Sequence, residues 1–117
     1  MPDQDQRILD VVFVTLGSEE MTGAIVYLRA EPLSRVVQLE VGDAVIDAPW
    51  DAHVVFVDLD PGANWGHACC YLAIRQDSED VVTVPARMPP FLKAGSTDFH
   101  LLWRGPLAPD WAVVEDG

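Results

Sequence analysis

Two apolar segments joined by a turn-rich loop are the feature of this 117-residue sequence that most restricts its fold. Residues 53–60 (HVVFVDLD) and 67–75 (HACCYLAIR) are rich in Val, Phe, Leu and Ala, and the loop between them contains proline, glycine and asparagine. Apolar runs bounded by such turn residues are typical of two antiparallel strands. We therefore predict a central β-hairpin, which holds both cysteines and two of the three histidines.

The alternation of side chains along a strand predicts how the two strands align. A register that places Asp58 opposite Cys69 and Phe56 opposite Tyr71 leaves one face of the hairpin wholly apolar. That face is expected in the core and consists of Val55, Val57, Leu59, Ala68, Cys70, Leu72 and Ile74. The opposite face is polar only at its loop end. A shift of one residue would mix the two faces, so the pattern favours this register.

The rest of the chain predicts more strands and little helix. Further apolar, β-branched runs occur at 8–16, 22–30, 34–41, 44–47, 81–84, 99–104 and 111–114. The polar residues 17–20 between the first two runs predict that these form a second hairpin. Residues 1–7 are expected to form a flexible tail, and residues 85–98 a long loop containing proline and glycine. No apolar residues recur at helical spacing over the length of a helix. We therefore predict one all-β domain over 1–117, an antiparallel β-sandwich or small barrel.

Residues 41–53 (VGDAVIDAPWDAH) suggest a second fold. Gly42 is followed eleven positions later by His53, and this spacing resembles the second conserved stretch of cupins. The resemblance covers about a tenth of the chain and implies a cupin-like jelly roll that binds a small molecule or a metal. The sequence departs from the cupin pattern because it lacks the glycine after the proline. It also has no histidine before His53, so the cupin metal triad has no source.

Charge narrows the range of partners. Seven Lys and Arg stand against nineteen Asp and Glu, which gives a formal net charge of −12. Such a chain repels phosphate backbones and anionic lipids, so we expect neither nucleic acid nor membrane as a partner. The acidic N-terminus does not resemble a secretory signal, and the adjacent cysteines are expected to be reduced thiols. These features predict a cytoplasmic protein.

Four side chains at the loop end of the hairpin form the candidate catalytic set. They are Asp58, Asp60, His67 and Cys69, which share one face in the predicted register. A cysteine beside a histidine that a carboxylate orients is the arrangement of a thiol nucleophile. The alternative is that the acids and the histidine decorate the solvent end of the hairpin and the cysteine is a small buried filler. The second interpretation is favoured, because no oxyanion donor is evident.

The same hairpin carries two combinations of residues of the types that bind metals. His53 and His67 are separated by roughly 20 Å at about 3.3 Å per strand residue, too far to share a zinc ion. The loop resembles a calcium loop in spacing, with Asp58, Asp60 and Asn64 as possible ligands, but its later positions do not fit an EF-hand. We predict no metal and no cofactor.

The hairpin loop also carries a tryptophan that could bind a partner. Trp65 is preceded by Asn64 and sits in a stiff loop between two strands, beside Asp58, Asp60 and His67. Tryptophan concentrates binding energy at interfaces, although here it could instead plug the end of the sandwich. The sequence therefore predicts a non-enzymatic protein-binding module that uses loop 60–67 to bind another protein or a second copy of itself. A Cys-His hydrolase or thiol enzyme using Cys69 and a cupin-like binder are the alternatives.

Overall fold

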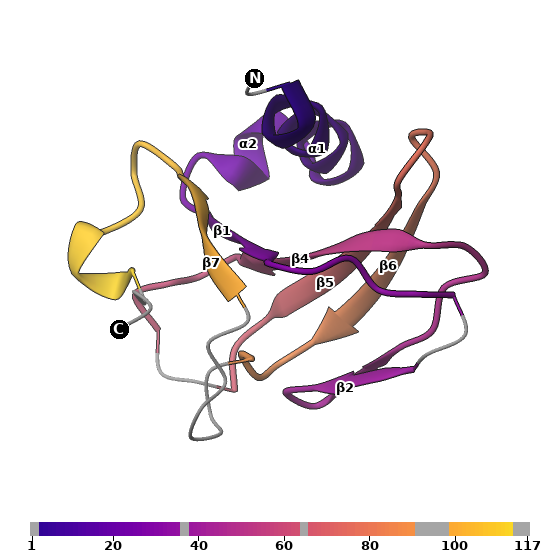
Figure 1. Cartoon of the computed structure of the whole chain (residues 1–117). Coiled ribbons are helices and arrows are strands. Elements are labelled where there is room, and N and C mark those ends of the chain that lie inside the picture. The colour runs from indigo at the N-terminus through magenta and orange to yellow at the C-terminus, as the bar shows by residue number, and fades with distance from the viewer. Residues whose placement is uncertain (1–2, 36–37, 64–65, 91–98, 114–117) are drawn as a thin grey trace.

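A five-stranded antiparallel sheet and a two-stranded hairpin make up most of the computed structural model, with two helices on one side (Figure 1). The structure describes residues 3–35, 38–63, 66–90 and 99–113. The elements are α1 (Asp3–Leu16), α2 (Ser18–Met21), β1 (Ile25–Arg29), β2 (Leu39–Val41), β3 (Ala44–Ile46), β4 (Ala52–Asp58), β5 (Cys69–Arg75), β6 (Val81–Ala86), β7 (Phe99–Arg104) and a 3-10 turn η1 (Asp110–Ala112).

The large sheet has the strand order β6-β5-β4-β1-β7 and lies between two covering layers. Helices α1 and α2 cover one face, and the β2–β3 hairpin lies below the other (Figure 1). The predicted all-β, antiparallel class is confirmed. The sheets do not close into a barrel, and the described strands do not form the paired sheets of a cupin-like jelly roll.

The central hairpin forms in the predicted register. β4 pairs with β5 so that Asp58 lies opposite Cys69 and Phe56 lies opposite Tyr71. The predicted apolar face packs against α1, although Leu59 is only half-buried and Ala68 is exposed. The other face is also buried, because the β2–β3 hairpin covers it. The two central strands are therefore enclosed on both faces, which their sequences alone did not reveal.

The N-terminal region differs from the prediction. Residues 3–7, predicted within a flexible tail, and the predicted strand 8–16 form helix α1 instead. Ile8, Val11 and Val12 share one face of this helix and are buried against the sheet. Their spacing of three and four residues is helical, but the β-branched side chains around them obscured it. Burial of this face outweighs the intrinsic preference of valine for strands.

The turn after α1 explains why no hairpin forms with residues 22–30. Gly17 has a φ of 94° and donates a backbone hydrogen bond to the carbonyl of Phe13 at 2.8 Å. A glycine with positive φ just after the last turn is a common end of a helix. The short helix α2 follows, and the chain then enters β1, which lies between β4 and β7 in the sheet. The predicted hairpin between 8–16 and 22–30 is therefore wrong.

Of the remaining predictions for the second half of the chain, some are confirmed and others are wrong. The strand predicted at 99–104 is β7, with the same bounds. The predicted strand at 111–114 is wrong for its described part, because Trp111 lies in η1. Residues 85–86, predicted in a loop, complete β6, and residues 91–98 of that loop lie outside the described residues. In the described part of the chain, no helix has the length and apolar character needed to cross a bilayer.

Candidate functional site

Asp58 and His67 form a close pair at the loop end of the central hairpin. Nε2 of His67 lies 2.7 Å from Oδ1 of Asp58, and the backbone N–H of Asp60 donates to the same oxygen at 3.2 Å. Asp58 is buried, and the side chain of His67 is 9% exposed. A buried carboxylate needs such donors to offset the loss of water. Asp58 is therefore held at the base of the hairpin loop by contacts within the protein and is not exposed to a partner.

The segment that follows β6 is held over this end of the hairpin. The Tyr71 hydroxyl donates to the carbonyl oxygen of Met88 at 3.0 Å, and Sγ of Cys69 lies 3.8 Å from the same oxygen. From the turn between β2 and β3, the Asp43 carboxylate accepts hydrogen bonds from the backbone N–H groups of Arg87 and Met88. The polar groups at this end of the hairpin thus fix residues 87–88 in place.

The environment of Cys69 opposes the formation of a thiolate. Burial raises the pKa of Cys69 to about 12, and the carboxylates of Asp58 and Asp43 contribute to the increase. Burial alone raises the pKa of Cys70 to about 11. A nucleophilic cysteine requires the opposite, namely a pKa lowered by a nearby cation or a base. The candidates Cys69, His67 and Asp58 are near one another, but the arrangement stabilises the thiol form.

Cys69 should therefore react slowly with iodoacetamide at neutral pH. In a Cys70→Ala variant, which leaves one thiol, we expect alkylation at least about 100-fold slower than that of glutathione, because little thiolate is present. The rate should keep rising as the pH increases past 9, since the pKa is about 12. Mass spectrometry of timed samples measures the rate, and the same variant unfolded in guanidinium is the control. Alkylation as fast as that of glutathione would contradict this prediction.

The other predicted site residues do not form a metal site in the described structure. Asp60 is exposed at the start of the loop, whereas Asn64 and Trp65 lie outside the described residues. His53 is buried near the opposite end of β4. Over the described ranges, no three His, Cys, Asp or Glu side chains are grouped so that they could hold a metal ion. The predicted binding role of Trp65 stays a prediction.

A different surface, along β7, was not predicted from the sequence. Among the described strands, β7 pairs only with β1 and thus forms one edge of the large sheet. His100, Leu101 and Arg104 are exposed on this strand. The sequence indicated the strand, but strand order depends on long-range pairing and could not be read from the local pattern.

The segment after β7 presents two large apolar side chains to solvent. Leu107 is 76% exposed and Trp111 is 74% exposed. Ala108 of the same segment packs into the core cluster that contains Phe99 of β7, and Figure 1 shows the segment beside this strand. The surroundings of these residues, GPLAPDW, are rich in turn residues, and this is the signal that could have placed both side chains on the surface. We call β7, Leu107 and Trp111 the β7 surface.

Hydrogen bonds hold this segment in a defined conformation. The N–H of Gly105 donates to the carbonyl of Ala24, and the N–H of Leu107 donates to that of Thr22 at 3.0 Å. The guanidinium of Arg104 donates to the carbonyl of Ala108. Trp111 is therefore displayed on a turn that is already ordered, so that little entropy is lost when it contacts a partner.

Comparisons of this chain with protein-family models, with curated protein sequences and with solved structures found no match.

Proposed function

We propose that this protein is a non-enzymatic, cytosolic protein-binding module that receives an extended segment of another protein along β7. The observation that carries the proposal is an edge strand without a second strand partner in the described structure, next to two exposed apolar side chains. An exposed edge offers backbone N–H and C=O groups to an incoming strand, and neighbouring apolar side chains supply the contact area.

The two edges of the sheet differ in a way that supports this choice. β6, the other edge, contains Pro85, which cannot donate a ladder hydrogen bond and commonly protects an edge strand. β7 has the sequence FHLLWR and no proline or lysine. Only Arg104, at its end, carries a fixed charge. β7 thus lacks the proline and lysine that commonly protect an edge, although its pairing with β1 shifts register at Leu102.

Charge favours a different protein over a second copy. At a formal net charge of −12, two copies repel each other, whereas a basic segment is attracted. Both cysteine thiols are buried and their pKa values are raised, which supports a module without thiol catalysis. Both cysteines are free, which fits a reducing compartment.

The proposal can be tested with peptides that are selected from a random display library for binding to the immobilised protein. Their affinity is then compared between the protein and its Trp111→Ala variant. We expect the selected peptides to give intermolecular backbone NOEs to β7. The variant should weaken their binding at least about 30-fold, or about 2 kcal/mol, while still unfolding cooperatively. Isothermal calorimetry measures the affinity. Val45→Ala is the matched control, because Val45 is an exposed apolar residue on β3.

Two results would contradict the proposal in different ways. If the selected peptides contact residues 60–67 and Trp65→Ala abolishes their binding instead, the module binds through the predicted hairpin loop and the β7 surface is wrong. If the immobilised protein enriches no peptide relative to the bare support, the proposed binding function itself is wrong.

A further inference from the structure

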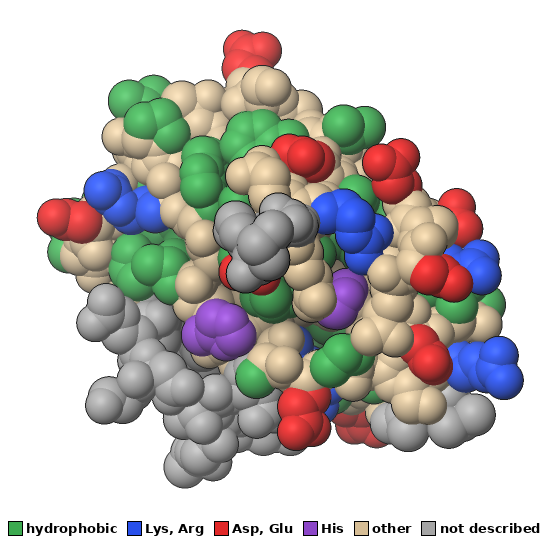
Figure 2. All heavy atoms as spheres, turned by 45° about the horizontal axis from the view of Figure 1, so that its top comes forward, with side chains coloured by type: hydrophobic (Ala, Val, Ile, Leu, Met, Phe, Trp, Pro, Cys, Tyr) green, Lys and Arg blue, Asp and Glu red, His purple; other side chains and the backbone are tan. Residues whose placement is uncertain are grey.

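A groove of about 240 Å³ lies between α1 and the end of the β5–β6 hairpin. It is lined by Asp10, Val11, Val14, Thr15, Glu79 and Val81. Figure 2 shows the side of the molecule that carries the helices, where hydrophobic and acidic side chains lie interspersed. Because the groove adjoins β6, at the opposite edge of the sheet from β7, it is separate from the β7 surface.

Valines give the groove an apolar lining. Val11 is buried and Val81 is half-buried, and they form the part nearest the core. Val14 projects outward from α1 and is 86% exposed, the highest value among the large exposed hydrophobic residues of the described structure. A side chain with an aliphatic stem could cover these valines and remove apolar area from water.

Two acidic side chains line the groove, and none of its described lining residues is a lysine or an arginine. Asp10 comes from α1 and Glu79 comes from the β5–β6 turn, so that the two carboxylates belong to opposite walls. Both residues are exposed. The Asp10 carboxylate accepts one hydrogen bond, from Nε2 of Gln6 at 2.8 Å, which leaves acceptor capacity for a ligand. The groove thus combines an apolar lining with negative charge on both sides.

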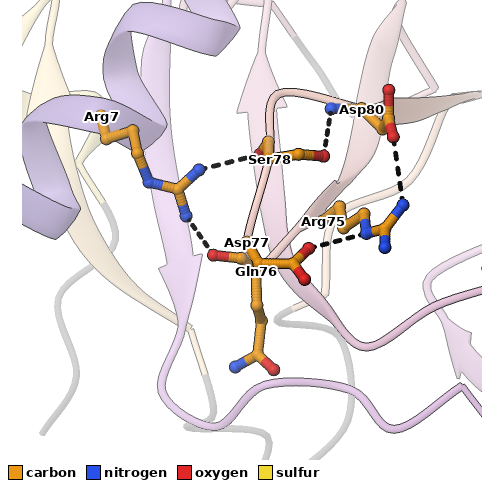
Figure 3. Close-up of polar contacts among 6 residues, drawn as sticks. All are labelled: Arg7, Arg75, Gln76, Asp77, Ser78 and Asp80. Atoms are coloured by element: carbon orange, nitrogen blue, oxygen red, sulfur yellow. Dashed lines mark hydrogen bonds and ion pairs between the residues drawn. The ribbon is translucent and has the colours of Figure 1, made fainter.

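Arg7 fixes the two walls relative to each other (Figure 3). From α1, its guanidinium donates to the carbonyl oxygen of Gln76 at 2.7 Å and to that of Ser78 at 2.8 Å. The nearby Arg75 is itself paired with Asp77 and Asp80, on the same turn. The charge of Arg75 is therefore compensated within the turn, whereas the two hydrogen bonds of Arg7 go to backbone carbonyls and do not neutralise its charge. The same two hydrogen bonds join the walls, so the groove is already formed before a ligand arrives.

We propose that this groove receives a lysine side chain of a partner protein. The methylene stem lies along Val11, Val14 and Val81, and the ammonium group lies between Asp10 and Glu79, in the way long cationic side chains cover apolar surface. The net charge of −12 attracts such a partner. A single exposed ion pair contributes little, so the contacts of the residues flanking the lysine on the exposed Val14 must add to it. A peptide segment therefore fits better than a free amine.

Titration of the ¹⁵N-labelled protein with the peptide Ac-Ser-Leu-Lys-Leu-Ser-NH₂ tests this inference. We expect amide shifts concentrated in residues 10–15 and 79–81. Replacing the peptide lysine by norleucine, which keeps the aliphatic stem and removes the ammonium group, should weaken binding by about fivefold or more. The double variant Asp10→Asn/Glu79→Gln should have the same effect. The matched control is Glu19→Gln/Glu20→Gln, which removes the same charge from exposed positions on α2 and should change the affinity less than about twofold.

Other results would overturn the inference. One is a set of amide shifts that lies outside the groove. Another is an equal loss of affinity for the lysine peptide in the two double variants. A third is a norleucine peptide that binds as tightly as the lysine peptide. Binding of n-butylammonium as tight as that of the peptide would show a site for small amines instead. If a peptide with arginine in place of the lysine binds equally well, the groove is a site for any cationic side chain. The spectrum of each variant reports whether it is folded, so a loss of binding is not confused with a loss of structure.

Discussion

Replacing Leu72 by Ala should lower the free energy of unfolding by about 2–5 kcal/mol, because burial is lost and a cavity remains. Leu72 is fully buried on β5, between the strand partners Val55 and Thr83, and its side chain packs in the cluster beneath α1. The neighbouring strands pair through their backbones and cannot collapse easily into the space. Urea denaturation followed by circular dichroism measures the change.

Leu107→Ala is the matched control for this substitution. It removes the same atoms at a position that is 76% exposed, and surface changes of this kind usually alter stability by less than about 0.5 kcal/mol. An equally small effect at Leu72 would place that face of the hairpin in solvent and contradict the layer arrangement.

Gly105→Ala should destabilise the protein by about 3 kcal/mol, through overpacking and the loss of nearby hydrogen bonds. A Cβ atom at this position would lie 2.5 Å from the carbonyl oxygen of Met21 and in hard contact with that of Thr22. Both obstacles are backbone atoms, so they cannot rotate away. The change should also disturb the hydrogen bond from Gly105 to Ala24, and with it the position of the segment after β7.

Gly23→Ala provides a control in the neighbouring turn between α2 and β1. Nothing lies within 4 Å of a Cβ atom built there. We expect no loss and at most a gain of about 1 kcal/mol, since alanine reduces the freedom of the unfolded chain. Thermal unfolding of both variants in parallel measures the difference, and equal melting temperatures would contradict the close approach at Gly105.

The parts of the fold that could be predicted are those encoded by local alternation. The register of β4 with β5 follows from the apolar side chains at every second position, and it also brings Asp58 and His67 to the same end of the hairpin. Helix α1 was missed because its buried positions are hidden within an almost continuous apolar run. The period of a run can be recognised only where polar residues interrupt it regularly.

The candidate site was likewise predicted only where it depends on the local sequence. The sequence placed Cys69 beside a histidine and two acids, but the burial of the thiol depends on residues 43 and 88, which are distant along the chain. The β7 surface was missed for a related reason. Whether a strand is an edge depends on which other strands pair with it, and the pairing of β7 with β1 joins residues 70 to 79 positions apart.

That pairing also sets the order in which the sheet can be completed. β1 is synthesised before the other strands of the large sheet, and β4, β5 and β6 can join it on one side before β7 has left the ribosome. Until then the outer edge of β1 has no strand on it. Contacts between distant segments close slowly, because the intervening chain must lose its freedom before they form. The closure of β7 onto β1 is thus the step that moves the open edge of the sheet from β1 to β7.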